Sequence, residues 1–325
     1  MNGADTLAFW VAAPGRGELR REAVPAPGAR EASVQALFSG VSRGSEALVF
    51  GGHVPASEYE RMRAPFQVGQ FPAPVKYGYA SVGRVTQGPN ELTGKLVFCL
   101  HPHQQRYVVA CEALYVLPES VPARRAVLAA NLETALNGVW DCAVAPGDRV
   151  SVVGAGSVGC LAAWLISRLP GCEVELIDIN PHRARTAQAL GVSFAQPAEA
   201  RPEADVVLHS SGSSEGLALA MRIAGYEATV LELSWYGDRP VTLALGEAFH
   251  SRRLTLKSSQ VGAIAPARQC RWSFRRRMQL ALSLLTDPAL DALINSEGGF
   301  EELPQTMPEL ARAPGDVIMH RVRYD

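Results

Sequence analysis

The most constraining feature of this chain is a glycine-rich turn that joins an apolar run to a helical pattern. The run 150–153 is rich in valine, Gly-x-Gly-x-x-Gly follows at 154–159, and residues 160–168 have the apolar spacing of a helix. A second apolar run, 174–177, ends at Asp178, at about the 20-residue separation of the dinucleotide fingerprint. This order of strand, glycine turn, helix, strand and acid predicts a dinucleotide-binding unit.

Each part of the motif has a physical role toward a dinucleotide. Gly154 permits the tight turn, Gly156 lets the backbone approach a pyrophosphate, and Gly159 lets helix and strand pack closely. The helix begins near Ser157 and Val158, and its first turn presents N–H groups and the positive end of the helix dipole to phosphates. We predict that these five residues bind the cofactor.

Asp178 bears on the identity of the cofactor. Its carboxylate can accept hydrogen bonds from ribose hydroxyls and would repel a 2′-phosphate, which favours NAD over NADP. His182 and Arg183 follow closely and can weaken that preference, so NADP stays open and Arg183 is a predicted cofactor contact. The alternative is that both are ordinary first-turn helix residues after Pro181.

Two strand-end loops extend the predicted cofactor site. Ser211 and Gly212 follow the apolar run 206–208, and Ser234 ends the next run. The carboxyl ends of parallel strands meet at the edge of the sheet where cofactors bind, so these three residues are predicted contacts.

Composition limits the class of protein. The 325 residues suit two domains, and 47% apolar with 19% charged residues suits a sizeable core. With a net charge of −1, the chain lacks the excess positive charge that attracts nucleic acids and membrane surfaces. We therefore expect neither as a partner. No run approaches the length of a membrane span and no signal pattern opens the chain. Six scattered cysteines without Cys-x-x-Cys favour reduced thiols and a cytoplasmic location.

The organisation along the chain changes near residue 125. Before it, short apolar runs alternate with glycine and proline, which is typical of a β-rich region. After it, a predicted helix over 126–140 leads into alternating strands and helices, which predicts a parallel sheet within an α/β fold. A helix over 275–286 and a strand-like run over 316–322 close the chain. The expected parts are 1–130, 131–260 and a C-terminal segment, 261–325.

Several motifs together resemble one superfamily. They are Gly40-Val41-Ser42-Arg43, the run from Lys76 to Val85, Gly147-Asp148-Arg149-Val150 and the glycine turn. The chain resembles the medium-chain dehydrogenase/reductase superfamily, the alcohol dehydrogenase-like enzymes. The resemblance implies a GroES-like, β-rich catalytic domain and a Rossmann domain with a doubly wound parallel sheet. It also implies that the C-terminal segment returns to the catalytic domain, that the active site lies between the domains, and that the protein is a homodimer.

The chain departs from the zinc enzymes of that superfamily. They carry cysteine where this chain has Ser42, and the histidine of Gly-His-Glu where it has Tyr79. Glu133 is similar to the third ligand of polyol-dehydrogenase relatives. Serine, tyrosine and one glutamate make a poor zinc site, and the four-cysteine structural lobe is missing, so we expect no metal ion.

Without zinc, hydrogen-bond donors must stabilise the charge that develops on the carbonyl oxygen. Tyr79 is the predicted donor, since its phenol stands at the histidine position, and Ser42 is a second. The alternative for Tyr79 is a packing residue that fills the metal space.

Two further residues are candidates. His103, in the loop His101-Pro102-His103, is a predicted proton shuttle, with a loop surface as the alternative. Glu133 is a predicted buried base, or else the partner of Arg43 or Lys76.

Two polar segments have ordinary structural interpretations. We expect residues around 58–63 to form an amphipathic helix on the surface. The alternative is that the segment containing them contacts the substrate. The basic run 275–277 is expected to be a solvated helix face or a subunit contact.

The sequence therefore predicts an NAD(H)-dependent oxidoreductase that interconverts a small-molecule alcohol and a carbonyl without zinc. A quinone or enone reductase of the same fold is one alternative, although its usual NADPH preference disagrees with Asp178. A nucleotide-binding relative without catalysis is the other, because the metal ligands are lost.

Overall fold

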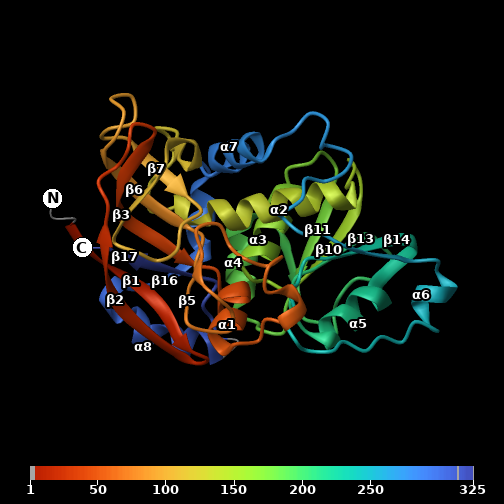
Figure 1. Ribbon diagram of the computed structural model, residues 1–325. Coiled ribbons are helices and arrows are strands. Elements are labelled where there is room, and N and C mark those ends of the chain that lie inside the picture. Colours follow the sequence, from red (N-terminus) through yellow and green to blue (C-terminus); the bar gives the residue numbers. More distant parts are fainter. Residues whose placement is uncertain (1–3, 313–314, 325) are drawn as a thin grey trace. The chain divides into compact units, whose positions relative to one another are not determined.

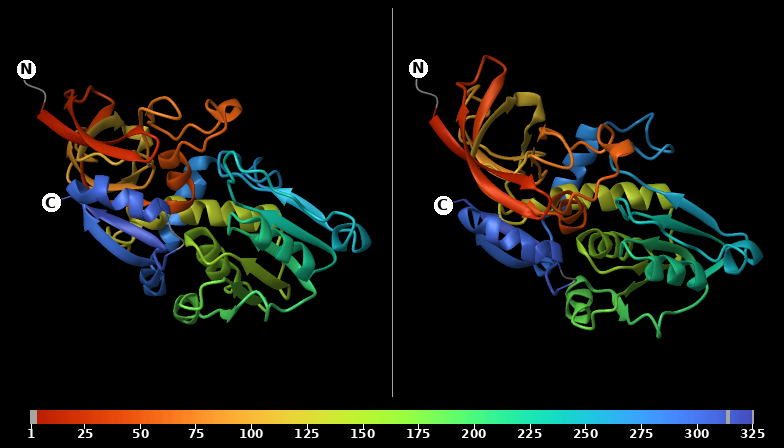
Figure 2. Two further views of the ribbon diagram at one scale, coloured as in Figure 1. Left: turned by 90° about the horizontal axis from the view of Figure 1, so that it is seen from below. Right: turned by 60° about the horizontal axis from the view of Figure 1, so that its bottom comes forward.

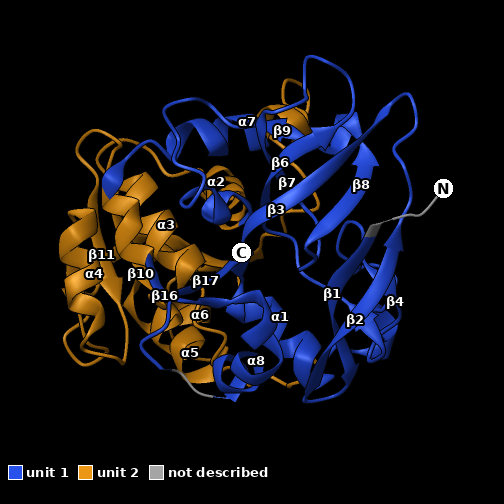
Figure 3. Ribbon diagram, turned by 90° about the vertical axis from the view of Figure 1, so that its left-hand side faces the viewer, with its two compact units in different colours: residues 1–130, 278–288, 294–325 blue, residues 131–277, 289–293 orange. Residues whose placement is uncertain are grey.

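The chain divides into two units, each with its own sheets, in a computed structural model that describes residues 4–312 and 315–324 (Figure 3). Unit 1 consists of residues 1–130, 278–288 and 294–325, and unit 2 of residues 131–277 and 289–293. Residues 261–277, which the sequence analysis grouped with the C-terminal segment, therefore belong to unit 2.

Unit 1 contains a seven-stranded sheet whose path is β16-β17-β3-β6-β7-β9, with β8 paired to β3. The C-terminal strand β17 pairs antiparallel with β3, with Val322 opposite Ser39. The strands are β3 (Glu31–Val41), β6 (Ser81–Gln87), β7 (Leu96–Cys99), β8 (Arg106–Ala110), β9 (Tyr115–Val116), β16 (Ile294–Gly299) and β17 (Met319–Arg323).

A four-stranded sheet and several helices complete unit 1. The sheet has the order β2-β1-β5-β4, and α8 packs against α1, β2 and β16 (Figures 1 and 2). These strands are β1 (Ala4–Ala13), β2 (Arg16–Val24), β4 (Val68–Gly69) and β5 (Val75–Lys76); the helices are α1 (Arg43–Gly51) and α8 (Leu303–Arg312), with 3-10 turns at Ala56–Glu58, Cys111–Ala113, Ala126–Leu128 and Phe300–Glu302.

The prediction of a helix around 58–63 is wrong. The segment holds only the short 3-10 turn Ala56–Glu58, followed by turns. Pro55 and Pro65 bracket too short a stretch for a stable helix, and a proline disfavours helical backbone at the residue before it.

Unit 2 is built on a six-stranded sheet in the order β12-β11-β10-β13-β14-β15, in which every neighbouring pair is parallel. Helix α3 packs on β10 and β11, α4 on β12, and α5 on β13 and β14 (Figure 1). The strands are β10 (Arg149–Val153), β11 (Glu173–Ile177), β12 (Ser193–Ala195), β13 (Ala204–His209), β14 (Ala224–Glu232) and β15 (Thr255–Ser258).

The helices of unit 2 are α3 (Ser157–Ile166), α4 (Arg183–Leu190), α5 (Ser214–Ile223) and α6 (Ala248–Ser251), and all but the first residue of a 3-10 turn over Pro288–Leu293 belong to the same unit. Helix α2 (Ala129–Cys142) belongs to unit 2 except for its first two residues, and α7 (Phe274–Leu284) begins in unit 2. Among the described residues, no helix has both the length and the apolar character needed to cross a bilayer.

The apolar runs of the sequence become the core of this sheet. Leu176, Ile177 and Leu208 are fully buried, and each such side chain stabilises the fold by about 1.5–3 kcal/mol. Continuous burial is expected for parallel strands that helices cover. The sheet therefore holds the loops at its carboxyl edge on a rigid support.

Candidate functional site

The glycine turn joins β10 to α3 in unit 2. Gly154 has φ of +108°, and a Cβ there would lie 2.6 Å from the backbone N of Ser211. A Cβ on Gly159 would lie 1.9 Å from the carbonyl oxygen of Gly154. Both positions require glycine. A Cβ on Gly156, in contrast, would meet no described atom within 4 Å, so a phosphate group has room to approach the backbone there.

The N-terminus of α3 adds to this cradle. The helix begins at Ser157, with Gly156 as its N-cap and no side-chain capping bond. Its first-turn N–H groups and dipole suit an anion. The structure thus brings together the five residues predicted from the motif, and the cradle fits a dinucleotide pyrophosphate.

The carboxylate of Asp178 adjoins the same turn. Its Oδ2 accepts the N–H of Ala155 at 2.7 Å, and its Oδ1 accepts the N–H of Asn180 at 2.8 Å. These two bonds fix its orientation, and each carboxylate oxygen retains capacity for a further donor such as a ribose hydroxyl. Arg183 is buried rather than exposed. Burial raises the pKa of Cys160 to about 12, against the opposing effect of the Arg183 charge, which places that charge near Cys160.

The strand-end loops bring the other predicted contacts together. The N–H of Gly212 donates to Ser234 Oγ at 3.0 Å, and Ser211 Oγ lies 2.6 Å from His209 Nε2. His209 is fully buried, and its Nδ1 lies 2.7 Å from Glu232 Oε2. Glu232 and its pairing with His209 were not predicted from the sequence. The available signal was a polar residue at the end of each of two adjacent apolar strands.

A second buried polar cluster lies in unit 1 around Glu46. Its Oε1 accepts the N–H of Ser42 at 2.7 Å, and its Oε2 lies 2.8 Å from His103 Nε2. His103 Nδ1 lies 2.7 Å from Ser39 Oγ, which in turn lies 2.9 Å from the Tyr324 hydroxyl. His103 is 1% exposed, so it does not lie on a loop surface, and both of its ring nitrogens are engaged. This placement suits a residue that orients Glu46.

Tyr79 lies beside the same cluster. Burial and, to a smaller extent, the Glu46 carboxylate raise the pKa of Tyr79 to about 12, and hydrogen bonds with Ser42 and Ser45 oppose the rise. The phenol therefore remains protonated near neutral pH and can donate a hydrogen bond. The structure brings together the two predicted donors, Tyr79 and Ser42.

Glu133 pairs with neither of its expected partners. Its Oε1 accepts from Arg277 Nε at 3.0 Å, and Arg277 also donates to Asn137 Oδ1 and to the carbonyl oxygen of Ala263. Arg277 is 1% exposed. The expectation of a solvated face is therefore wrong for this member of the basic run 275–277, because its guanidinium reaches several buried acceptors. Burial raises the pKa of Glu133, and the charge of Arg277 opposes the rise.

The donor set does not fit zinc. Ser42 and Tyr79 present hydroxyl groups, whereas zinc binds thiolate, imidazole and carboxylate. Both nitrogens of His103 are engaged. Across residues 4–312 and 315–324, no group of three or more histidine, cysteine, aspartate or glutamate side chains is arranged to hold a metal ion.

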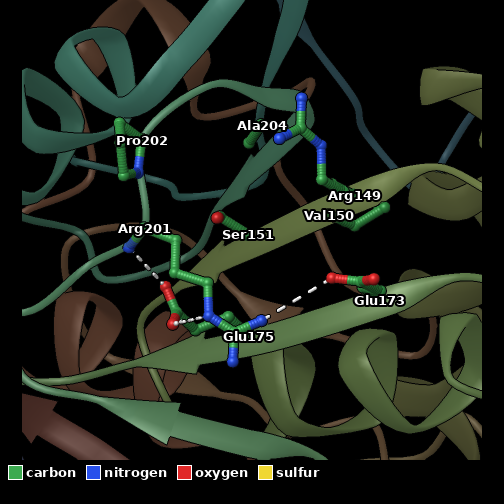
Figure 4. A pocket seen from close by; sticks show the side chains of 8 residues that line it. All are labelled: Arg149, Val150, Ser151, Glu173, Glu175, Arg201, Pro202 and Ala204. Atoms are coloured by element: carbon green, nitrogen blue, oxygen red, sulfur yellow. Dashed lines mark hydrogen bonds and ion pairs between the residues drawn. The ribbon is translucent and has the colours of Figure 1, made fainter.

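A pocket of about 150 Å³ in unit 2 lies away from the glycine turn. Arg149, Glu173 and Ala204 line it and are the first residues of their strands, so the pocket is at the amino edge of the sheet. Figure 4 shows Arg201 paired with Glu175 and Glu173 there. Cofactors of this fold bind at the opposite, carboxyl edge, and this pocket is therefore not the candidate site.

Comparison with known proteins agrees with this geometry. Residues 150–216 match the family model of the ketopantoate reductase PanE/ApbA, which covers only the glycine-turn half of unit 2. The D-guloside 3-dehydrogenase of Escherichia coli K12 is 23% identical over 309 residues, covering 86% of this chain and 88% of that protein.

Solved structures match almost the whole chain. A structure from Sinorhizobium meliloti 1021 with NADP bound has a TM-score of 0.79 at 17% identity, covering 98% of this chain and 99% of the other. A short chain alcohol dehydrogenase of E. coli CFT073 with NADH bound has a TM-score of 0.78 at 14% identity, covering 99% and 100%. These matches confirm the predicted α/β fold, with a GroES-like unit and a Rossmann unit.

Proposed function

We propose that this protein, which has the fold of the medium-chain dehydrogenase/reductase superfamily, is an NAD(H)-dependent oxidoreductase that interconverts an alcohol and a carbonyl without zinc. The observation that carries the proposal is the cradle at the glycine turn, open above Gly156 and adjoined by the fixed Asp178 carboxylate. The dehydrogenase relatives support the reaction class.

The chemistry divides between cofactor and protein. When bound, the nicotinamide cofactor supplies or accepts the hydride. Unit 2 holds it: the turn 154–159 binds the pyrophosphate, Asp178 binds ribose hydroxyls, and the loops with Ser211, Gly212 and Ser234 contribute further contacts. Arg183, whose side chain is buried, remains a proposed cofactor contact.

Unit 1 supplies the groups that act on substrate oxygen. Tyr79 holds a proton at its phenol oxygen and donates a hydrogen bond to the oxygen on which negative charge develops. Ser42 is the second donor. Removing one such preorganised donor typically lowers kcat about 10²- to 10³-fold. His103 and Glu46 orient this cluster, and Glu133 anchors Arg277 rather than acting as a base.

Donor chemistry supports zinc independence, since Ser42 and Tyr79 replace two ligands that zinc prefers. The carboxylate of Asp178 favours NAD over NADP. The relative acts on a D-guloside, so sugar alcohols and glycosides form the first substrate panel.

We also propose a homodimer and a cytoplasmic location. Strand β15 lies at the edge of the unit 2 sheet with Leu256 38% exposed, and such an edge can pair with that of a second copy. All six cysteines are free thiols, as in a reducing compartment. Light scattering with and without Leu256→Lys tests the dimer, and fractionation of the native host tests the location.

The first experiment measures metal content and titrates NADH and NADPH fluorescence on freshly purified protein, with and without a chelator. NADH binding without stoichiometric zinc, followed by turnover of an alcohol or carbonyl, supports the proposal. Zinc at one ion per chain would overturn zinc independence. Turnover of quinones alone would point to the reductase alternative, and binding without turnover on either panel to a non-catalytic relative.

A further inference from the structure

Phe66, in unit 1, combines two features that are unusual for a phenylalanine. Its φ is +57°, in the left-handed region that bulky side chains rarely adopt. The residue is also 41% exposed, so full burial of the ring does not offset the backbone strain. A strained residue that keeps an apolar ring in contact with water points to a functional role.

The strain follows from the turn that Phe66 occupies. The N–H of Gln67 donates to the carbonyl oxygen of Ala64 at 3.2 Å, which closes a β-turn over 64–67. Pro65 has its φ fixed near −65° by its ring. A proline followed by a positive φ defines a type II turn, in which glycine is favoured at the third position. The chain has phenylalanine where the backbone favours glycine.

Side chains hold this turn in place. Arg63 donates to the carbonyl oxygens of Gln67 at 3.2 Å and of Gly69 at 3.1 Å. The side-chain oxygen of Gln67 accepts the N–H of Ala64 at 3.1 Å, while its Nε2 is buried and has no hydrogen-bond partner among the described residues. An unpaired buried donor is unfavourable. The turn is therefore maintained despite two unfavourable local features.

Two further rings fix the orientation of Phe66. The ring centroids of Phe66 and His101 are 5.5 Å apart, with the planes tilted by 31°. The imidazole of His101 in turn stacks on Tyr107 at 3.7 Å. His101 and Tyr107 are both buried, so Phe66 is the exposed end of a ring stack that is rooted in the core of unit 1.

The same stack adjoins the groups proposed to act on substrate. His101 shares a short loop with His103, which belongs to the polar cluster of the proposed donors. A Cβ on Gly78 would lie 2.9 Å from Cδ2 of His103, and Tyr79 follows Gly78 in the chain. Phe66 therefore lies in the part of unit 1 that carries Tyr79.

We propose that Phe66 is a stacking platform for the ring of a sugar substrate, so that the protein acts on glycosides in preference to open-chain alcohols. A pyranose ring has an apolar face of C–H groups, which an aromatic ring binds through dispersion and the burial of apolar surface. This inference rests on the proposed function, because it assumes that unit 1 binds an alcohol substrate near Tyr79. Glu60 and Gln70 are exposed on the same segment and offer acceptors for sugar hydroxyls.

The test compares kcat/KM for a methyl D-guloside, for its open-chain counterpart D-gulitol and for benzyl alcohol. Phe66→Ala removes the platform and should lower kcat/KM for the guloside about 2- to 12-fold, the range for one aromatic contact, with little change for D-gulitol. The loss should appear in KM rather than in kcat, since the ring binds substrate away from the reacting oxygen. Phe66→Tyr keeps an aromatic face and should keep the values of the unmodified protein.

Stability distinguishes a platform from a packing residue. Phe66→Gly also removes the ring, but glycine adopts a positive φ without strain. Its melting temperature should exceed that of Phe66→Ala by about 2–4 °C, although both variants lose the same factor in kcat/KM for the guloside. A residue that only covers His101 would instead affect the guloside and D-gulitol equally.

Val116→Ala is the matched control, because Val116 is 45% exposed on β9 and its removal should change none of these values. Circular dichroism verifies the folding of each variant. An unchanged kcat/KM for the guloside in folded Phe66→Ala, an equal loss for D-gulitol, a loss confined to benzyl alcohol, or turnover of open-chain alcohols alone would overturn the inference only. Absence of turnover on every alcohol and carbonyl would overturn the proposed function itself, and the inference with it.

Discussion

His103 Nε2 lies 2.8 Å from Glu46 Oε2, and both side chains are almost fully buried. This pair ties the loop before β8 to the first turn of α1, which carries Ser42 as its N-cap. A buried carboxylate is costly without a partner. The pair therefore matters for stability in unit 1, whatever reaction the protein performs.

We expect His103→Leu to lower the free energy of unfolding by about 1–3 kcal/mol, because it leaves the buried Oε2 of Glu46 without its hydrogen-bond partner. His103→Gln should cost less, since an amide can still donate to Glu46. Urea unfolding of both variants checks this. In the activity assay, a positioning role predicts that His103→Gln keeps kcat within about tenfold, whereas a proton shuttle predicts a loss of about 10²-fold or more in both.

Tyr79 is the residue on which the proposed chemistry depends. Tyr79→Phe removes the donor while keeping the ring, so kcat should fall about 10²- to 10³-fold with little change in the dissociation constant of NADH. Tyr226→Phe, at a tyrosine that is 66% exposed, is the control and should leave both values unchanged. Undiminished turnover by Tyr79→Phe would identify Tyr79 as a packing residue.

Substitutions in the glycine turn should separate effects on cofactor binding from effects on stability. Gly156→Ala meets open space, so it should keep the melting temperature but weaken NADH binding at least tenfold by blocking the approach of the pyrophosphate. Gly159→Ala places Cβ 1.9 Å from the Gly154 carbonyl oxygen and should destabilise the protein by about 2 kcal/mol or more. Calorimetry and fluorescence titration measure the two effects. Equal losses of stability in both variants would contradict the open space at Gly156.

Local patterns explain why much of unit 2 could be predicted. The expected strand 174–177 is β11 without its first residue, and the glycine turn and its helix lie where the motif placed them. Hydrophobic periodicity and glycine positions are properties of neighbouring residues, so one sequence contains them.

The partners of the polar residues could not be predicted in this way. Glu133 and Arg277 are 144 positions apart, and His103 and Glu46 are 57 apart. The resemblance to polyol dehydrogenases singled out Glu133, but only the fold selects among several basic residues as its partner. The burial of Arg277 could not be predicted for the same reason. Its two neighbours in the basic run have the same residue type but are exposed.

Acid should destabilise the protein through His101. Burial lowers the pKa of His101 to about 3, with smaller effects from Lys76 and His103 in the same direction and an opposing one from the Pro102 carbonyl. Because the folded-state pKa lies below the ordinary 6.5, the stabilising contribution is present above pH 6.5 and is lost as pH falls toward 3. Lowering the pH from 7 to 4.5 should cost about 2–3 kcal/mol from this residue.

His101→Phe isolates this contribution. The imidazole stacks on Tyr107 at 3.7 Å between ring centroids, and a phenyl ring can keep that stacking without taking up a proton. Urea unfolding at pH 7 and pH 4.5 should show a smaller loss in His101→Phe than in the unmodified protein. A residual loss is expected from His320, because burial lowers its pKa to about 4. The exposed His250, replaced by Gln, should leave the full pH dependence in place; an equal reduction in that control would argue against His101 as the source.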